Sequence, residues 1–163
     1  METRGDTREL LSRCDLFIGL DDERIEKLAA ICFERPVADG QHLFHAADPA
    51  TELFVLAEGS VSLEMLSGGR NVVVEVCGPT QAVVWSALRL NGLYSLSARV
   101  VENGRALVFL GTWLQRALAV DTKMAGVVYR NLAELVGRRW EGLMNPGVAY
   151  TGPLAAPAEE EVT

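Results

Sequence analysis

The stretch LFVLAEGSVSLEM at residues 53–65 decides the fold class of this chain. In its second half, Val61, Leu63 and Met65 alternate with polar residues. Successive side chains of a strand point to opposite faces of a sheet, so this period of two predicts a half-buried β-strand. The apolar run at residues 53–56 predicts that the same region begins with a more deeply buried segment.

Further short strands and turns surround this stretch. The sequence SGGR at residues 67–70 is typical of a hairpin turn, and residues 71–77 alternate like a second strand. Two more strands are predicted at residues 97–101 and 106–110, with the turn-like sequence ENG between them. Many short antiparallel strands, spaced by about ten residues, are typical of a barrel or jelly roll. We expect a small β-barrel over about residues 37–110.

Helices are expected before the barrel, over about residues 7–34. The acidic residues at positions 21–23 would lie at the positive end of a helix dipole, which favours a helix start there. Apolar residues then recur at helical spacing and predict one buried stripe, made of Ile25, Leu28, Ala29 and Cys32. Pro36 is expected to end this helix.

Helices are also expected after the barrel, over about residues 112–143. Thr112 is a candidate N-cap for a short helix, and Asp121 for a long one. The predicted fold class is therefore mainly β with flanking helices. It consists of a small β-barrel or jelly roll with N-terminal helices and a long C-terminal helix.

Length and composition are those of a single domain. The chain has 163 residues, of which 49% are hydrophobic and 23% charged, so it can bury a core. We expect one domain over residues 1–144 and a disordered tail over residues 145–163, which carries three prolines, three consecutive glutamates and no periodicity. No apolar run is long enough to span a membrane, and no signal peptide is visible. These features predict a soluble, cytoplasmic protein with no membrane association.

Charge and residue usage exclude several function classes. There are 15 Lys and Arg residues against 22 Asp and Glu, and the net charge of −7 argues against direct nucleic-acid binding. The three cysteines form no CxxC motif, and an offset of three would place His42 and His45 on opposite faces of a strand, so no metal site is predicted. No catalytic arrangement is visible either, and the chain is predicted not to be an enzyme.

Several short motifs occur in a recognisable order. They are DLFIGL at residues 15–20, ADGQHLF at 38–44, DPA at 48–50 and LFVLAEGSV at 53–61. Together with the order helix, barrel, helix, they resemble the cyclic nucleotide-binding domain of the catabolite activator (Crp/Fnr-like) family. The resemblance covers about residues 10–143. It implies the fold of that domain and a role in ligand sensing.

The resemblance also implies a phosphate-binding cassette, and here the sequence departs from the family. In the family, a short helix cradles the cyclic phosphate, an arginine pairs with it, and a glutamate accepts from the ribose hydroxyl. The corresponding stretch here is GPTQAVVWSAL at residues 78–88, in which Trp85 replaces the glutamate and Val84 a glycine. Leu96 stands at the arginine position, and no arginine occurs from residue 90 to residue 98.

The candidate ligand pocket consists of Val84, Trp85, Ser86, Ala87, Leu88, Leu96, Ser97, Ala98 and Arg99. Trp85 is interpreted as a plug that fills the vacated pocket, in preference to a platform for a planar ligand. The serines are interpreted as local capping groups rather than anion ligands. Arg99 alternates with Ala98 along a strand and is expected to point out of the barrel.

The sequence therefore predicts a stand-alone cyclic nucleotide-binding-like regulatory or sensor module. It would not bind cyclic nucleotide in the usual way and would act through another ligand or a protein partner. The alternative is a receptor for cyclic AMP or cyclic GMP with an unconventional pose, signalling through the C-terminal helix; no other cofactor is predicted. A DNA-binding regulator would need a helix-turn-helix domain, which the 20 residues after Leu143 cannot form.

The resemblance implies a homodimer formed through the long C-terminal helix. Its apolar stripe supplies the candidate interface, made of Val128, Leu132, Leu135, Val136 and Leu143. The competing interpretation is that this stripe packs against the barrel of its own chain.

Overall fold

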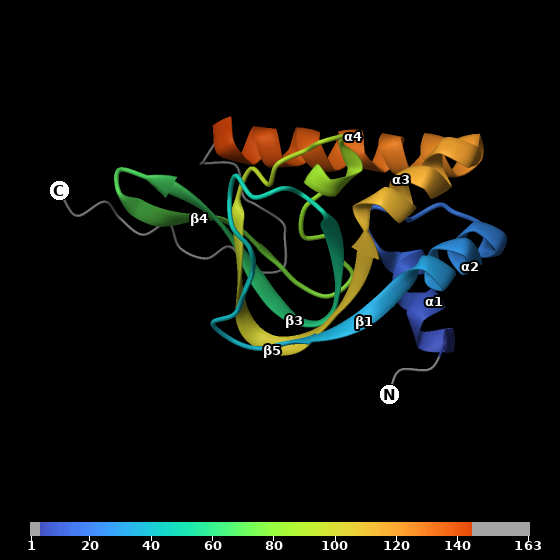
Figure 1. Cartoon of the computed structure of the whole chain (residues 1–163), viewed down its shortest axis with the longest axis horizontal. Coiled ribbons are helices and arrows are strands. Elements are labelled where there is room, and N and C mark those ends of the chain that lie inside the picture. Colours follow the sequence, from blue (N-terminus) through green and yellow to red (C-terminus); the bar gives the residue numbers. More distant parts are fainter. Residues whose placement is uncertain (1–3, 145–163) are drawn as a thin grey trace.

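The computed structural model describes residues 4–144, in which helices flank an antiparallel β-sheet that curls into a barrel (Figure 1). The helices are α1 (Arg4–Arg13), α2 (Asp22–Ile31), α3 (Gly111–Val120) and α4 (Thr122–Met144), with a short 3-10 helix η1 (Ser86–Leu88). The strands are β1 (Cys32–Val37), β2 (His42–Phe44), β3 (Glu52–Ser67), β4 (Arg70–Cys77) and β5 (Ser97–Leu110). The predicted fold class is confirmed. The expected tail at residues 145–163 lies outside the described residues.

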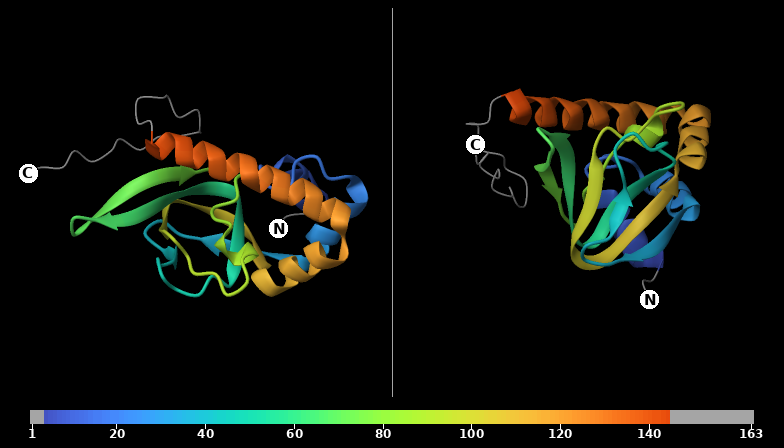
Figure 2. Two further views of the ribbon diagram at one scale, coloured as in Figure 1. Left: turned by 90° about the horizontal axis from the view of Figure 1, so that it is seen from above. Right: turned by 60° about the vertical axis from the view of Figure 1, so that its left-hand side comes forward.

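The sheet has the order β1-β5-β3-β4, and β2 also pairs with β5. Every pairing is antiparallel. β3 holds the sheet together because it pairs with β5 along most of its length and with β4 over residues 61–67. The hairpin predicted at residues 67–70 connects β3 and β4, and this ribbon extends beyond the rest of the barrel (Figure 2).

Two predicted element boundaries are wrong. The first helical region ends at Ile31, and Cys32 begins β1 instead of completing the helical stripe. Pro36 lies inside β1, where it is tolerated because β1 pairs on one side only, with β5. The third helix begins at Gly111 after Leu110 and receives no side-chain cap from Thr112.

The two strands expected at residues 97–101 and 106–110 form the single strand β5. Its middle crosses β3 at a series of register shifts rather than at a turn. A Cβ on Gly104 would lie 2.0 Å from the carbonyl oxygen of Glu58, and one on Gly59 would lie 2.6 Å from that of Glu102. The two glycines therefore permit a backbone approach that no other residue allows.

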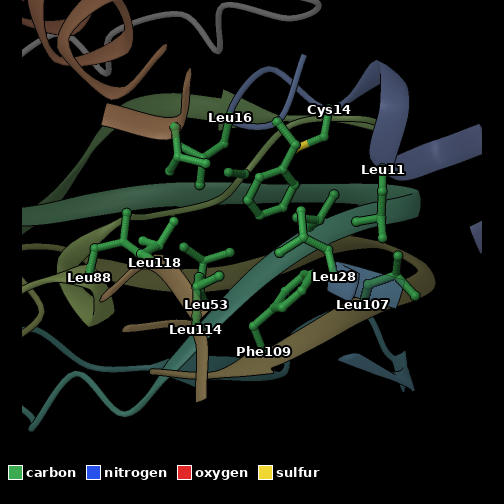
Figure 3. Packing of buried hydrophobic residues seen from close by; sticks show 14 of the residues in the cluster. Leu11, Cys14, Leu16, Leu28, Leu53, Leu88, Leu107, Phe109, Leu114 and Leu118 are labelled. Atoms are coloured by element: carbon green, nitrogen blue, oxygen red, sulfur yellow. The ribbon is translucent and has the colours of Figure 1, made fainter. Parts of the chain in front are cut away.

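Two apolar clusters form the core. One fills the barrel and includes Phe44, Phe54, Leu63, Tyr94 and Val108. The other lies between the barrel and the helices, which cover one end and one side of the sheet (Figure 1). It includes Leu11, Leu28, Phe109 and Leu114, which Figure 3 labels, and Val128. Side chains of the first cluster point into the barrel, and those of the second cluster point toward the helices.

The start of α4 is fixed by charged and polar contacts. The Asp121 carboxylate accepts a hydrogen bond from the backbone N–H of Met124 at 3.0 Å, which confirms the predicted cap. Arg24 of α2 donates to the same carboxylate at 3.1 Å. Further along α4, the Asn131 amide donates to the carbonyl oxygens of Leu16 and Ile18. α4 is therefore held against both α2 and the segment that precedes α2 in the chain.

No helix within residues 4–144 is long and apolar enough to cross a membrane.

Candidate functional site

The segment that corresponds to the cassette leaves β4 and runs back along β3. The backbone N–H of Thr80 donates to the Leu56 carbonyl at 2.9 Å, and that of Val83 donates to the Phe54 carbonyl at 2.9 Å. Thr80, the third residue of the GPT sequence, has a φ of +68°. A β-branched residue rarely adopts this left-handed conformation, so the turn is strained where a glycine would fit without cost.

Asp15 fastens this segment from the N-terminal side. Its carboxylate accepts a hydrogen bond from the backbone N–H of Ala82 at 2.9 Å, and its own N–H donates to the Thr80 carbonyl at 3.1 Å. Burial raises the pKa of the Asp15 carboxyl, and the hydrogen bond from Ala82 opposes that shift. The cassette segment is thus anchored to the region before α2.

Trp85 does not plug the barrel. It packs against the cluster between the barrel and the helices, directly before η1. The Arg139 guanidinium of α4 lies over the Trp85 ring, 4.0 Å from its centroid, which is the distance of a cation–π contact. The interpretation of Trp85 as a pocket plug is therefore corrected, because the indole faces α4.

Arg139 also forms an ion pair with Glu75 of β4. The side chains of Arg139 and Glu75 are only 16% and 14% exposed. Removing two charges from water costs free energy that their mutual attraction must repay, so a one-sided substitution would leave an uncompensated charge. The cluster of Trp85, Glu75 and Arg139 joins the cassette segment, β4 and the last third of α4.

The barrel interior is filled by aromatic and aliphatic side chains. The rings of Tyr94 and Phe44 stack with centroids 3.8 Å apart. The Tyr94 hydroxyl donates to the Glu52 carbonyl at 2.8 Å and accepts from the Glu52 N–H at 3.0 Å. Burial raises the pKa of this hydroxyl. Tyr94 is thus held in place by the protein itself and has a structural role.

The nine candidate pocket residues do not line one cavity. Val84, Leu96 and Ala98 belong to the barrel interior, whereas Trp85, Ala87 and Leu88 belong to the cluster beneath the helices. Ser86, the first residue of η1, is buried.

The remaining two candidates lie on the outer face of the sheet, as expected for Arg99. The Ser97 hydroxyl accepts a hydrogen bond from the Ala46 N–H at 2.9 Å, which fits the local capping role predicted for it. Arg99 pairs with the Glu64 carboxylate at 3.0 Å. Neither side chain points toward the barrel interior.

The five candidate dimer residues of α4 also fall into two groups, one packed against the core and one exposed. Val128 is fully buried, and Leu132 and Leu135 pack against the chain's own core. Val128 is therefore corrected to a core position, whereas Leu132 and Leu135 are half-buried on the helical face that lies on the barrel. Val136 and Leu143 are exposed. The packing interpretation therefore holds for the first part of the stripe, and the dimer interface stays a prediction for Val136 and Leu143.

His42 and His45 lie on the same side, which corrects the expectation of opposite faces. β2 ends at Phe44, so strand alternation does not extend to His45, and the two rings stack with centroids 4.5 Å apart. Within the described part of the chain, no group of three or more His, Cys, Asp or Glu residues could hold a metal ion.

Sequence reasoning missed Glu75 and Arg139. Arg138 and Arg139 are adjacent basic residues on the last helix, but nothing in the local sequence indicates which of the two faces the barrel. Glu75 interrupts a run of valines in β4, and a charged residue in such a run is a weak sign of a buried partner.

Solved structures with similar folds include domains of two transcriptional regulators. The N-terminal domain of a transcriptional regulator from Streptomyces coelicolor is 29% identical, with a TM-score of 0.67, and the match covers 89% of this chain and 99% of that one. The sensor domain of the regulator DNR from Pseudomonas aeruginosa is 21% identical, with a TM-score of 0.70, and covers 93% and 99%.

An uncharacterized NTE family protein of Mycobacterium tuberculosis is 35% identical over 72 residues. This match covers 39% of the present chain and 12% of that protein, so the chain spans a small part of the curated relative. The family model described as the cyclic nucleotide-binding domain matches residues 34–120, the region that contains the barrel, the cassette segment and α3. More than half of the sequence is thus matched, and the chain belongs to the cyclic nucleotide-binding domain family.

Proposed function

We propose that this domain is a regulatory module that does not bind cyclic nucleotide in the usual way and signals through another ligand or a protein partner. Domains of this family are regulatory and normally non-catalytic. The observation that carries the proposal is the contact between Arg139 and Trp85. Trp85 stands at the position of the ribose-binding glutamate, and Arg139 of α4 lies over its indole ring.

The charges available near the cassette support this proposal. A cyclic phosphate needs an unpaired cation in a desolvated site. The position of that cation is occupied by Leu96, which packs against the barrel interior. The cation nearest to Trp85 is Arg139, and its charge is already compensated by Glu75. A nucleotide would have to break this ion pair and displace buried side chains.

We also propose that the module works as a homodimer through α4. Tyr129, Ala133, Val136, Trp140 and Leu143 are exposed and follow each other at alternating spacings of four and three residues. This is the heptad spacing of a coiled-coil interface, and α4 lies along the outer surface of the molecule (Figure 2). We call these five residues the α4 seam. Two of them, Val136 and Leu143, belong to the stripe expected from the sequence.

The free cysteines favour a reducing compartment, and we propose that the protein acts in the cytoplasm. Cys14 and Cys77 are buried, and Cys32 is half-buried. Burial raises the pKa of the Cys14 and Cys77 thiols, which makes them unreactive.

The test is a thermal-shift and calorimetric titration with cyclic AMP and cyclic GMP up to millimolar concentration. A ligand that binds only the folded state must raise the melting temperature. We expect neither a shift nor a heat of binding. A saturable shift that Ser97→Ala or Arg99→Ala abolishes, and that the exposed control Arg116→Ala does not change, would instead support a receptor with an unconventional pose.

A further inference from the structure

A pocket of about 490 Å³ lies on the outer face of the sheet, away from the cassette segment. Its lining comes from four strands: His42 of β2, Arg99 of β5, Glu64 of β3, and Arg70, Asn71 and Val73 of β4. The volume is within the range of small-molecule sites, and most of the lining side chains are polar or charged.

The strand register explains why these side chains meet. Arg99 is paired with His42 on one side and with Ser62 on the other. Glu64 follows Ser62 by two residues and therefore lies on the same face. The intervening Leu63 and the neighbouring Ala98 point into the barrel. The pocket is thus separated from the barrel interior by the sheet itself.

Glu64 is the most deeply buried charged group of this pocket, with a side chain that is 5% exposed. Arg99 donates to its Oε1 atom through Nε at 3.2 Å and through Nη2 at 3.0 Å, and the Ser62 hydroxyl lies 3.1 Å from the same oxygen. Among residues 4–144, no donor contacts the second oxygen, Oε2. Glu64 lines the pocket and its Oε2 atom is not enclosed by protein, so this oxygen is an open acceptor for a ligand.

The rim of the pocket supplies positive charge, opposite in sign to that of Glu64. Arg99 uses Nε and Nη2 for Glu64, which leaves its Nη1 atom without a hydrogen bond in the described chain. Arg70 has no carboxylate within ion-pair distance among the described residues. Since the Glu64–Arg99 pair is neutral, the guanidinium of Arg70 gives the pocket one net positive charge.

We propose that this pocket binds a small zwitterion. Its ammonium group donates to Oε2 of Glu64, and its carboxylate or phosphate accepts from Arg70 and from Nη1 of Arg99. The proposal does not depend on the proposed function, because no residue of the cassette segment lines this pocket.

The experiment compares ligands that carry both charges with ligands that carry one. The full chain, labelled with ¹⁵N, is titrated by NMR with 4-aminobutyrate and with phosphoethanolamine. Butyrate, butylamine and inorganic phosphate serve as single-charge controls. We expect at least one zwitterion to cause saturable shifts of the amides of Glu64, Asn71 and Val73. Its single-charge controls are expected to bind at least about tenfold more weakly, because each of them lacks one of the two charged contacts.

Variants then assign the two halves of the ligand. Arg70→Gln, which leaves the buried pair intact, is expected to weaken zwitterion binding about tenfold, whereas Arg116→Gln on α3 makes the same charge change outside the pocket and has no effect. Glu64→Gln is expected to remove the preference for the zwitterion over butyrate or phosphate. The proposal is overturned if neither zwitterion binds, if the single-charge controls bind as well, or if Arg70→Gln binds like the wild type. Cyclic nucleotide binding is measured separately, so failure here leaves the proposed function untouched.

Discussion

The guanidinium of Arg139 lies 4.0 Å from the centroid of the Trp85 ring and also pairs with Glu75. This contact connects the last third of α4 to the segment that would hold a phosphate in a nucleotide-binding relative. The helix is therefore docked on the barrel by the protein's own side chains. No ligand is needed to bring the two elements together.

Arg139→Gln is expected to lower the free energy of unfolding by about 1–3 kcal/mol, because Glu75 then keeps a largely buried charge without its partner. Chemical denaturation followed by Trp fluorescence measures this change. The neighbouring, exposed Arg138→Gln is the control and should change stability by less than about 0.5 kcal/mol.

A double-mutant cycle with Glu75→Gln separates the ion pair from the contact with Trp85. The double variant is expected to be more stable than the sum of the two single losses predicts, since removing both charges leaves none uncompensated. Strict additivity would show that the ion pair contributes no coupling energy, which contradicts the docking described above.

Thr80→Gly is expected to stabilise the protein, because Thr80 holds a φ of +68° that glycine adopts without strain. The gain is expected to be about 1 kcal/mol after the larger unfolded-state entropy of glycine is subtracted. Thr80→Asn, which tolerates this conformation, should lie between the two. The midpoint of urea denaturation measures the series, and a loss of stability in Thr80→Gly would contradict the prediction.

Gly104→Ala is expected to destabilise the domain by about 2–3 kcal/mol, because the new Cβ would meet the Glu58 backbone at 2.0 Å and force β3 and β5 apart. Gly142→Ala in α4 is the matched control, since a Cβ there meets nothing within 4 Å. The control should gain about 0.5–1 kcal/mol from helix propensity. Equal effects of the two substitutions on the melting temperature would refute the steric explanation.

Stability is expected to fall in acid as Asp121 is protonated. The Met124 N–H holds the pKa of this carboxyl at about 2, below its ordinary value of 3.8, and Arg24 and Lys27 act in the same direction. A lowered folded-state pKa gives stability that is complete above about pH 4 and is lost as the pH falls toward 2. Melting temperatures of the wild type and Asp121→Asn should differ above this range and converge below it.

Trp140→Glu is expected to convert a dimer to a monomer, because Trp140 is the largest exposed side chain of the α4 seam. Sedimentation equilibrium measures the mass. Glu134→Ala, an exposed change outside the seam, should leave the dimer intact. A monomeric wild type at high concentration would contradict the dimer proposal, and a dimeric Trp140→Glu variant would place its interface elsewhere.

Local patterns were sufficient for much of the fold. The period of two at residues 61–65 predicted β3, the glycines at residues 68–69 predicted the hairpin, and the acid before Thr122 predicted the start of α4. These signals depend on neighbours within a few residues, which sequence displays directly. The combination of motifs likewise identified the family, and the substitutions at Trp85 and Leu96 were visible without any structure.

By itself, then, the sequence determined the order of the elements, the family and the altered cassette. The tertiary structure alone decided which face each side chain serves: Trp85 lies under Arg139, Val128 lies in the core, and Cys32 begins a strand instead of ending a helix. It also brought Glu64, Arg70 and Arg99 to one pocket from three strands. The physical reason is that these outcomes depend on contacts between residues far apart in the chain, whose pairing is set by strand register and helix docking and leaves no local periodicity.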